Sequence, residues 1–266
     1  PVSDGADFGV LFTHNEGYSS MCGHGIIAMA TAAVETGMVA ASEPETAVAI
    51  DTPAGLVRAF VRVEDGAVEG VRFLNVPSFV AALDEAVEVP GLGRVRYDLA
   101  YGGAFYAFVD AASVGLACDG AHFRQLIEAG IVVKRAVASA AEIVHPFEDD
   151  LGFLYGVIFV DASPDERVHS RNCCVFADGE VDRSPTGTGV SARLAIHHAR
   201  GEIGVGEPVV ISSLIGSEFT GRVVKTTTFG PHPAVIPEVG GRAHITGRHE
   251  FVVDPDDPRG RGFILR

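Results

Sequence analysis

Short runs of β-branched and other apolar residues, separated by turn-forming glycines, dominate the chain. The turns include Glu64-Asp65-Gly66, Gly102-Gly103 and Asp178-Gly179. The pattern predicts strands at 47–51, 56–63, 71–76, 105–109, 153–160, 173–176, 209–212, 222–227 and 243–246. We therefore expect a chain in which strands outnumber helices.

Two Ala-rich stretches, 26–36 and 190–200, have the composition of helices instead, and each ends at a glycine typical of a helix C-terminus, Gly37 or Gly201. Shorter helical candidates lie at 111–116 and 120–129. The combined pattern predicts an α+β fold with few helices.

The two Ala-rich stretches belong to an internal repeat, in which the surroundings of Cys22 recur 164 residues later around Thr186. The matched pairs are Phe12 with Phe176, Ser20 with Ser184, Gly23 with Gly187, Gly25 with Gly189, Ala28 with Ala192, and Gly37 with Gly201. Two copies indicate a duplicated domain with a pseudo-two-fold axis. Ligand sites commonly form between such halves.

Composition narrows the classes of protein that fit. Of 266 residues, 47% are hydrophobic and 21% charged, which is enough core material for one large domain or two smaller ones. The formal charge of -15 disfavours nucleic-acid and membrane-surface partners, and no apolar run approaches the ~20 residues of a membrane-spanning helix. Four cysteines are too few for a disulfide scaffold and favour a cytoplasmic location. Because the chain starts at Pro1, we expect that part of its first half, and any targeting segment, precedes it.

Cys22 is the principal catalytic candidate, because the repeat places it at the N-terminus of a helix. Such an end gathers unpaired N–H groups and positive potential, which bind carboxylates and favour a thiolate. Gly23 and Gly25 would leave room for a ligand, and His24 would contact it or tune the thiol. The other cysteines, Cys118, Cys173 and Cys174, fit ordinary buried packing better.

Two other kinds of site are weighed against this one. His197 and His198 lie within the second helical stretch as packing or surface residues, and the remaining histidines lack metal-ligand spacing, so we expect no metal. The glycines after Cys22 and Thr186 also match a dinucleotide-binding fingerprint, with Glu43 and Glu207 at the ribose-binding distance. Polar loops precede both turns where a buried strand is required, so this alternative is weaker.

The chain resembles the proline racemase family, and within it the trans-3-hydroxy-L-proline dehydratase branch. The matching motifs, in order, are MCGHG at 21–25, DTPAGLV at 51–57, NVPSF at 75–79, YGGAFYA at 101–107, DRSPTGTG at 182–189 and PEVGG at 237–241. The resemblance implies a fold like that of diaminopimelate epimerase, with two pseudo-symmetric halves, each a curved, mostly antiparallel sheet around a central helix. The first half would comprise 1–75 plus 255–266 and carry Cys22, and the second would comprise 76–254 and carry Thr186.

The resemblance also implies roles in a cleft between the halves. Gly23, Gly187 and Thr188 would bind the substrate carboxylate, His24 and Asp182 would hold its ring nitrogen, and Phe176 would pack against the ring. No cofactor is implied. The partner would be a small molecule, hydroxyproline, and we allow for a homodimer.

Thr186 decides between activities within the family. Racemases carry cysteine at both equivalent positions, whereas a threonine hydroxyl is too weak an acid to exchange protons with an α-carbon near neutral pH. A single thiolate at Cys22 is expected to remove the C2 proton, after which the C3 hydroxyl leaves as water; Thr186, or a water that it positions, is one source of the proton for that hydroxyl. Two alternatives stay open: a proline or hydroxyproline racemase or epimerase, and a nucleotide-binding module on the Gly-rich turns.

Overall fold

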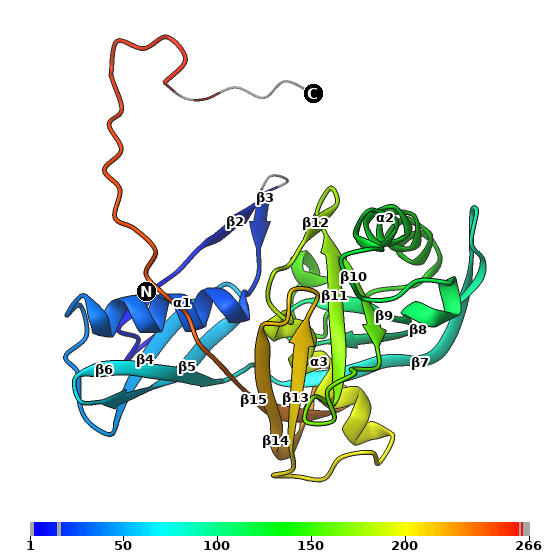
Figure 1. Ribbon diagram of the computed structural model, residues 1–266, viewed down its shortest axis with the longest axis horizontal. Coiled ribbons are helices and arrows are strands. Elements are labelled where there is room, and N and C mark those ends of the chain that lie inside the picture. Colours follow the sequence, from blue (N-terminus) through cyan, green and yellow to red (C-terminus); the bar gives the residue numbers. More distant parts are fainter. Residues whose placement is uncertain (1–2, 15–16, 261, 263–266) are drawn as a thin grey trace.

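A computed structural model describes residues 3–14, 17–260 and 262 of the chain. Most strands join one 13-stranded sheet, and β2 and β3 form a separate hairpin (Figure 1). The strands are β1 Phe8–Gly9, β2 Phe12–His14, β3 Gly17–Ser19, β4 Glu45–Thr52, β5 Gly55–Glu64, β6 Ala67–Leu74, β7 Ser78–Val89, β8 Gly93–Tyr101, β9 Phe105–Asp110, β10 Leu154–Asp161, β11 Ser170–Phe176, β12 Glu180–Val181, β13 Pro208–Ser213, β14 Glu218–Phe229 and β15 His232–Gly241. The helices are α1 Gly23–Glu35, α2 Phe123–Ala140 and α3 Gly187–Ala199, with 3₁₀ turns η1 Ala111–Val114 and η2 Asp149–Leu151.

One half of the molecule is a ring of strands closed around α3. The order β15-β14-β13-β11-β10-β9-β8-β7 returns to its start because β7 also pairs with β15. α3 is buried along most of its length, from Gly187 to His197. Ala and other small side chains in this helix allow the surrounding strands to approach it closely.

The other half is a curved sheet of β1, β4, β5 and β6, with α1 lying across it (Figure 1). The inward residues of α1, among them Ile26, Ile27 and Val34, pack against valines of β5 and Phe73 of β6. β15 pairs with β6 as well as with β14, so it joins this sheet to the ring. The predicted α+β architecture of two halves, each a mostly antiparallel sheet around a central helix, is confirmed.

Several predicted strands and helices differ in detail from those in the structure. Eight of the predicted strands correspond to β4, β5, β6, β9, β10, β11, β13 and β14, but 243–246 is coil beyond the end of β15. The sequence pattern missed β7, whose central part carries Asp84 and Glu85, β8, and β15, which contains Pro233 and Pro237, as well as the two- and three-residue strands β1, β2, β3 and β12. Acidic residues and proline are depleted in strands, which explains the omission of β7 and β15. The candidate helix at 120–129 is the first part of the longer α2, and the one at 111–116 is the 3₁₀ turn η1.

The chain passes from the first sheet into the ring between β6 and β7, and residues 242–260 run away from the sheet after β15 (Figure 1). The division into 1–75 plus 255–266 and 76–254 stays a prediction. Within the described residues, every helix is too short or too polar to cross a membrane.

Candidate active site

The N-termini of α1 and α3 meet at the boundary between the halves. Cys22 is the N-cap of α1 and Thr186 is the N-cap of α3. A Cβ atom on Gly23 would lie 2.5 Å from the Gly187 Cα, and one on Gly187 would lie 2.6 Å from the Gly23 Cα. Only glycine permits this approach on both sides, so the repeated glycine brings the two helix ends together.

The meeting of the helix ends also concentrates hydrogen-bond donors. The first helical bond of α1 runs from the Ile26 N–H to the Cys22 carbonyl, and that of α3 from the Val190 N–H to the Thr186 carbonyl. The N–H groups of residues 23–25 and 187–189 precede these bonds and point out of the helix ends. Two positive helix ends facing one point form a strong site for a carboxylate.

A small cavity of about 120 Å³ lies at this point. All eight residues singled out from the sequence line it: Cys22, Gly23, His24, Phe176, Asp182, Thr186, Gly187 and Thr188. Cys22 is partly exposed to the cavity, whereas Thr186 is buried. The structure thus brings together residues that are up to 166 positions apart in the sequence.

The reason given for Gly25 from the sequence is wrong. A Cβ there would lie 2.5 Å from the Phe12 ring, and a Cβ at the equivalent Gly189 would lie 2.3 Å from the Ile158 side chain. The space beside each of these glycines is filled by the protein's own side chains and leaves none for a ligand. The second glycine of each motif therefore serves packing behind the cavity.

Asp182 organises the polar side of the cavity. Its Oδ1 accepts a hydrogen bond from the Ser184 N–H at 2.8 Å, and its Oδ2 accepts one from the Thr186 hydroxyl at 3.1 Å. The His24 Nδ1 lies 3.2 Å from Asp182 Oδ1 and 3.1 Å from the Ser184 hydroxyl. One carboxylate therefore fixes groups from both helix ends.

These contacts set the charges of the pair. Hydrogen bonds to Asp182 and then to Cys22 raise the pKa of His24 to about 10, against the opposing effect of burial. Burial raises the pKa of Asp182, but the hydrogen bond and charge of His24 outweigh it, so the pKa lies below its ordinary value. Near neutral pH the pair is an imidazolium and a carboxylate.

Thr186 adopts a backbone φ of 68°, in the left-handed region. A β-branched residue rarely takes this conformation, which is found mainly where function requires it. The hydroxyl is thereby turned to Asp182 while the backbone begins α3.

Aromatic side chains also line the cavity. Tyr155 and Phe176 stack with ring centroids 5.5 Å apart, and the His14 ring meets both edge-on. The Tyr106 hydroxyl bonds to that of Thr188 at 2.8 Å. Sequence reasoning missed His14, Tyr106 and Tyr155, although Tyr106 lies in the YGGAFYA motif and His14 in the polar segment just before Cys22.

The remaining cysteines behave mostly as predicted. Cys118, Cys173 and Cys174 are buried, and burial raises the pKa of each thiol. Cys174 differs from the packing interpretation because it also lines the cavity. Its raised pKa keeps it as a neutral thiol, which makes it a poor candidate for a base.

The nucleotide and metal alternatives find little support. Glu43 accepts a hydrogen bond from the Gly66 N–H and Glu207 one from the Gly204 N–H, both outside the cavity. A cavity of about 120 Å³ is also far smaller than the ~300–1,000 Å³ typical of cofactor sites.

His197 is buried in α3 between Arg193 and Glu202 as a packing residue. Among the described residues, no group of His, Cys, Asp and Glu is arranged to hold a metal.

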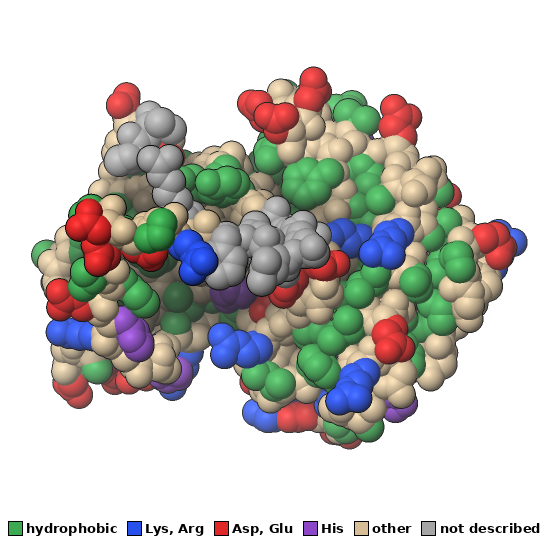
Figure 2. Space-filling view, turned by 90° about the horizontal axis from the view of Figure 1, so that it is seen from above, with side chains coloured by type: hydrophobic (Ala, Val, Ile, Leu, Met, Phe, Trp, Pro, Cys, Tyr) green, Lys and Arg blue, Asp and Glu red, His purple; other side chains and the backbone are tan. Residues whose placement is uncertain are grey.

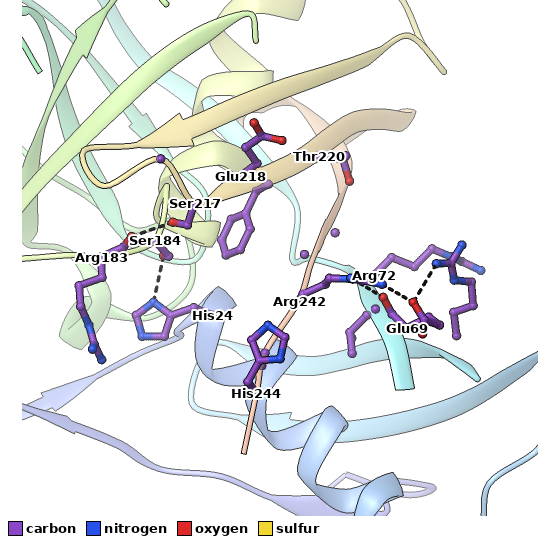
Figure 3. A pocket seen from close by; sticks show the side chains of 18 of the residues that line it. His24, Glu69, Arg72, Arg183, Ser184, Ser217, Glu218, Thr220, Arg242 and His244 are labelled. Atoms are coloured by element: carbon purple, nitrogen blue, oxygen red, sulfur yellow. Dashed lines mark hydrogen bonds and ion pairs between the residues drawn. The ribbon is translucent and has the colours of Figure 1, made fainter. Parts of the chain in front are cut away.

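A wider groove of about 1040 Å³ adjoins the cavity, and His24 and Asp182 line both. Figure 2 shows the two halves as lobes on either side of a hollow. Figure 3 shows the groove, with His24 bonded to Ser184 at one end and Arg242 paired with Glu69 at the other. Arg72 is paired with Glu45 and Glu238, so much of the groove's positive charge is already neutralised.

The His24–Asp182 pair gives a testable pH dependence. A raised pKa means that the pair stabilises the fold fully below the ordinary histidine pKa and loses this effect as the pH rises through about 10. We expect ¹⁵N NMR to show His24 as an imidazolium at roughly pH 8, well above the ordinary range. Asp182→Asn should lower the pH at which the His24 ring loses its proton. A neutral His24 ring at roughly pH 8 in the unaltered protein would contradict the charged His24–Asp182 pair.

The contact between helix ends gives a second prediction. Gly187→Ala must push α1 and α3 apart, because the new Cβ would overlap the Gly23 backbone. Overpacking of this kind costs about 1–3 kcal/mol. We expect urea denaturation to show a lower free energy of unfolding, together with weaker binding of carboxylate ligands. Gly120→Ala is the control, since a Cβ there meets nothing within 4 Å; equal stability of the two variants would contradict the contact.

Comparison with known proteins agrees with this geometry. The family model described as proline racemase matches residues 1–264. The chain is 49% identical over 263 residues to the trans-3-hydroxy-L-proline dehydratase of Colwellia psychrerythraea, covering 99% of this chain and 74% of that protein. It is 48% identical over 266 residues to a 3-hydroxyproline 2-epimerase of Burkholderia multivorans, covering 100% and 79%.

The chain also resembles a solved structure in its three-dimensional fold. The hydroxyproline epimerase of Agrobacterium vitis with bound trans-4-hydroxy-L-proline matches with a TM-score of 0.94 at 38% identity, covering 100% of this chain and 76% of that one. Fold and cavity together define a two-lobed enzyme whose candidate site lies between two helix N-termini. The chain belongs to the proline racemase family.

Proposed function

We propose that the chain is a cofactor-independent hydro-lyase that converts trans-3-hydroxy-L-proline to Δ1-pyrroline-2-carboxylate. One observation carries this proposal: Cys22 and Thr186 occupy equivalent N-cap positions on the two helices that meet at one cavity. The cavity size of about 120 Å³ fits a small ring such as proline. The dehydratase name of several relatives at 48–49% identity supports the same substrate.

Substrate binding follows from the charges around the cavity. The carboxylate lies between the helix ends and accepts hydrogen bonds from the N–H groups of Gly23, Gly187 and Thr188. The ring nitrogen donates to Asp182, and the His24 imidazolium balances the charge of that carboxylate. Phe176 packs against the ring carbons, on the wall that it shares with Tyr155.

The reaction needs one base at C2. The Cys22 thiolate takes the C2 proton, and the helix ends stabilise the charge that develops next to the carboxylate. The electron pair left at C2 forms a double bond to C3 as the C3 hydroxyl departs. The resulting enamine tautomerises to the imine product. Thr186 holds Asp182 in place and offers no second thiol to reprotonate C2 from the other face.

The second candidate is a hydroxyproline 2-epimerase, favoured by relatives of that name at 48% identity. Epimerisation needs a second acid on the face opposite Cys22. The second-half residues that line the cavity offer the Thr186 hydroxyl, the Cys174 thiol and the hydroxyls of Tyr106 and Tyr155, and burial raises the pKa of the last three groups. All four are poor proton donors and acceptors for an α-carbon near neutral pH, so dehydration is preferred.

Product analysis tests the proposal. We expect the protein incubated with trans-3-hydroxy-L-proline, without added metal or cofactor, to yield a product lighter by one water in mass spectrometry. Trans-4-hydroxy-L-proline, which has no leaving group next to C2, should yield no such product. Inversion at C2 of either substrate without loss of water would favour the epimerase instead.

A cytoplasmic location and a homodimer stay predictions from the sequence.

A further inference from the structure

We propose that His14 is the general acid that protonates the C3 hydroxyl as it leaves, on the same face of the substrate ring as Cys22. This inference rests on the dehydratase function proposed above. It assigns a role to a residue that the sequence analysis did not single out, and it replaces Thr186 as the source of that proton.

The configuration of the substrate decides from which side the acid must come. In trans-3-hydroxy-L-proline the hydroxyl and the carboxylate lie on opposite faces of the ring. The C2 hydrogen also lies opposite the carboxylate, so it shares a face with the hydroxyl. A base at Cys22 that reaches the C2 hydrogen therefore faces the leaving group as well. Thr186, at the equivalent position of the other half, faces the opposite side of the ring.

The segment that leads into Cys22 and α1 also lines the cavity. Its lining residues before Cys22 are Phe12, Thr13, His14, Ser19 and Met21. The Ser19 hydroxyl already donates to the Met21 carbonyl at 3.0 Å, and the Thr13 hydroxyl is as weak an acid as that of Thr186. His14 is the residue of this set with an imidazole side chain, the type that most often acts as a general acid in enzymes.

The position of the His14 ring suits this role. His14 ends β2, and the β2–β3 hairpin leads within three residues to Cys22. Its ring centroid lies 6.0 Å from that of Tyr155 and 6.1 Å from that of Phe176, edge-on to both. Phe176 is the proposed support of the substrate ring, so His14 stands beside the ring's edge.

The other proton donors around the cavity are less suited to this step. The Tyr106 hydroxyl is bonded to Thr188 at 2.8 Å, and burial raises the pKa of Tyr155. Both tyrosines belong to the second half. The His24 imidazolium lies against Asp182, at the place proposed for the ring nitrogen.

Cys22 and His14 together account for both protons that move in the elimination. The Cys22 thiolate gains the C2 proton, the C2–H pair becomes the C2=C3 bond, and the C3–O bond breaks with its electrons on oxygen. The His14 imidazolium supplies the proton that makes this hydroxide water. Between turnovers the proton on the Cys22 thiol passes through solvent to His14, which restores both groups without any external reactant.

His14→Gln tests the role, since glutamine keeps the size and polarity but has no titrating proton. We expect dehydration of trans-3-hydroxy-L-proline to fall by about 10²-fold or more, the usual contribution of a general acid. Exchange of the C2 hydrogen for deuterium in D₂O should continue, because that step needs only Cys22. His249→Gln, on the exposed tail, is the matched control and should dehydrate at the rate of the unaltered protein.

Two substrates sharpen the test. Trans-3-fluoro-L-proline loses fluoride, a leaving group that needs far less protonation, so His14→Gln should process it much closer to the normal rate. Cis-3-hydroxy-L-proline, whose hydroxyl faces the Thr186 side, should exchange its C2 hydrogen without losing water.

The outcomes separate this inference from the proposed function. If the unaltered protein does not dehydrate the substrate, the proposed function fails. If it does so and His14→Gln dehydrates equally fast, or loses C2 exchange to the same extent as dehydration, the role of His14 is overturned. Loss of dehydration with C2 exchange preserved supports it.

Discussion

Cys22→Ser is expected to abolish both dehydration and C2 hydrogen exchange, with a loss of about 10³-fold or more. A serine hydroxyl keeps the size and the position at the N-cap of α1, but it is not ionised near neutral pH. The loss should appear in kcat with little change in the binding of a planar carboxylate such as pyrrole-2-carboxylate, because the helix N–H groups remain in place.

Cys118→Ser is the control for a general effect of removing a thiol. Cys118 is buried outside the cavity, and its thiol donates to the Phe159 carbonyl, a bond that serine can also make. We expect this variant to retain activity. Substantial dehydration by Cys22→Ser would exclude Cys22 as the base.

Thr186→Cys is expected to change the outcome of the reaction. A thiol at this position restores an acid on the second face of C2, so proton removal at Cys22 can be followed by reprotonation from the other side. We expect dehydration to fall by about 10-fold or more and inversion at C2 to appear, measured by chiral chromatography. Loss of the hydrogen bond from the hydroxyl to Asp182 adds to the fall.

Thr186→Ser separates the hydroxyl from the methyl group. It keeps a donor to Asp182, and serine also tolerates the φ of 68° better than a β-branched residue. We expect this variant to dehydrate without inverting C2. If Thr186→Cys dehydrates at the normal rate and forms no epimer, position 186 does not face the substrate.

The sequence predicted the part of the site that depends on the repeat. Cys22 and Thr186 are each followed by two glycines and an Ala-rich stretch, so their equivalence can be recognised from short stretches of sequence. Helix termini can also be predicted from the residues next to them. The meeting of Gly23 with Gly187 then follows from the pseudo-two-fold arrangement, because equivalent helix ends face each other across the axis.

The rest depends on contacts between distant segments. Tyr155 comes from β10 and His14 from a hairpin of two three-residue strands, and neither segment shows a periodicity that marks one face as the cavity wall. The sequence also did not predict that the ring of strands closes through the pairing of β7 with β15. Acidic residues in β7 and prolines in β15 lower their strand propensity, whereas pairing with neighbouring strands decides their conformation.

Proton NMR of trans-3-hydroxy-L-proline in D₂O with the unaltered protein tests the central claim of one-base chemistry most directly. We predict that the C2 signal is lost as Δ1-pyrroline-2-carboxylate appears, and that the substrate remaining is entirely of L configuration, with or without deuterium at C2. Accumulation of C2-deuterated cis-3-hydroxy-D-proline without the pyrroline product would contradict the account, since it requires a second acid on the Thr186 face.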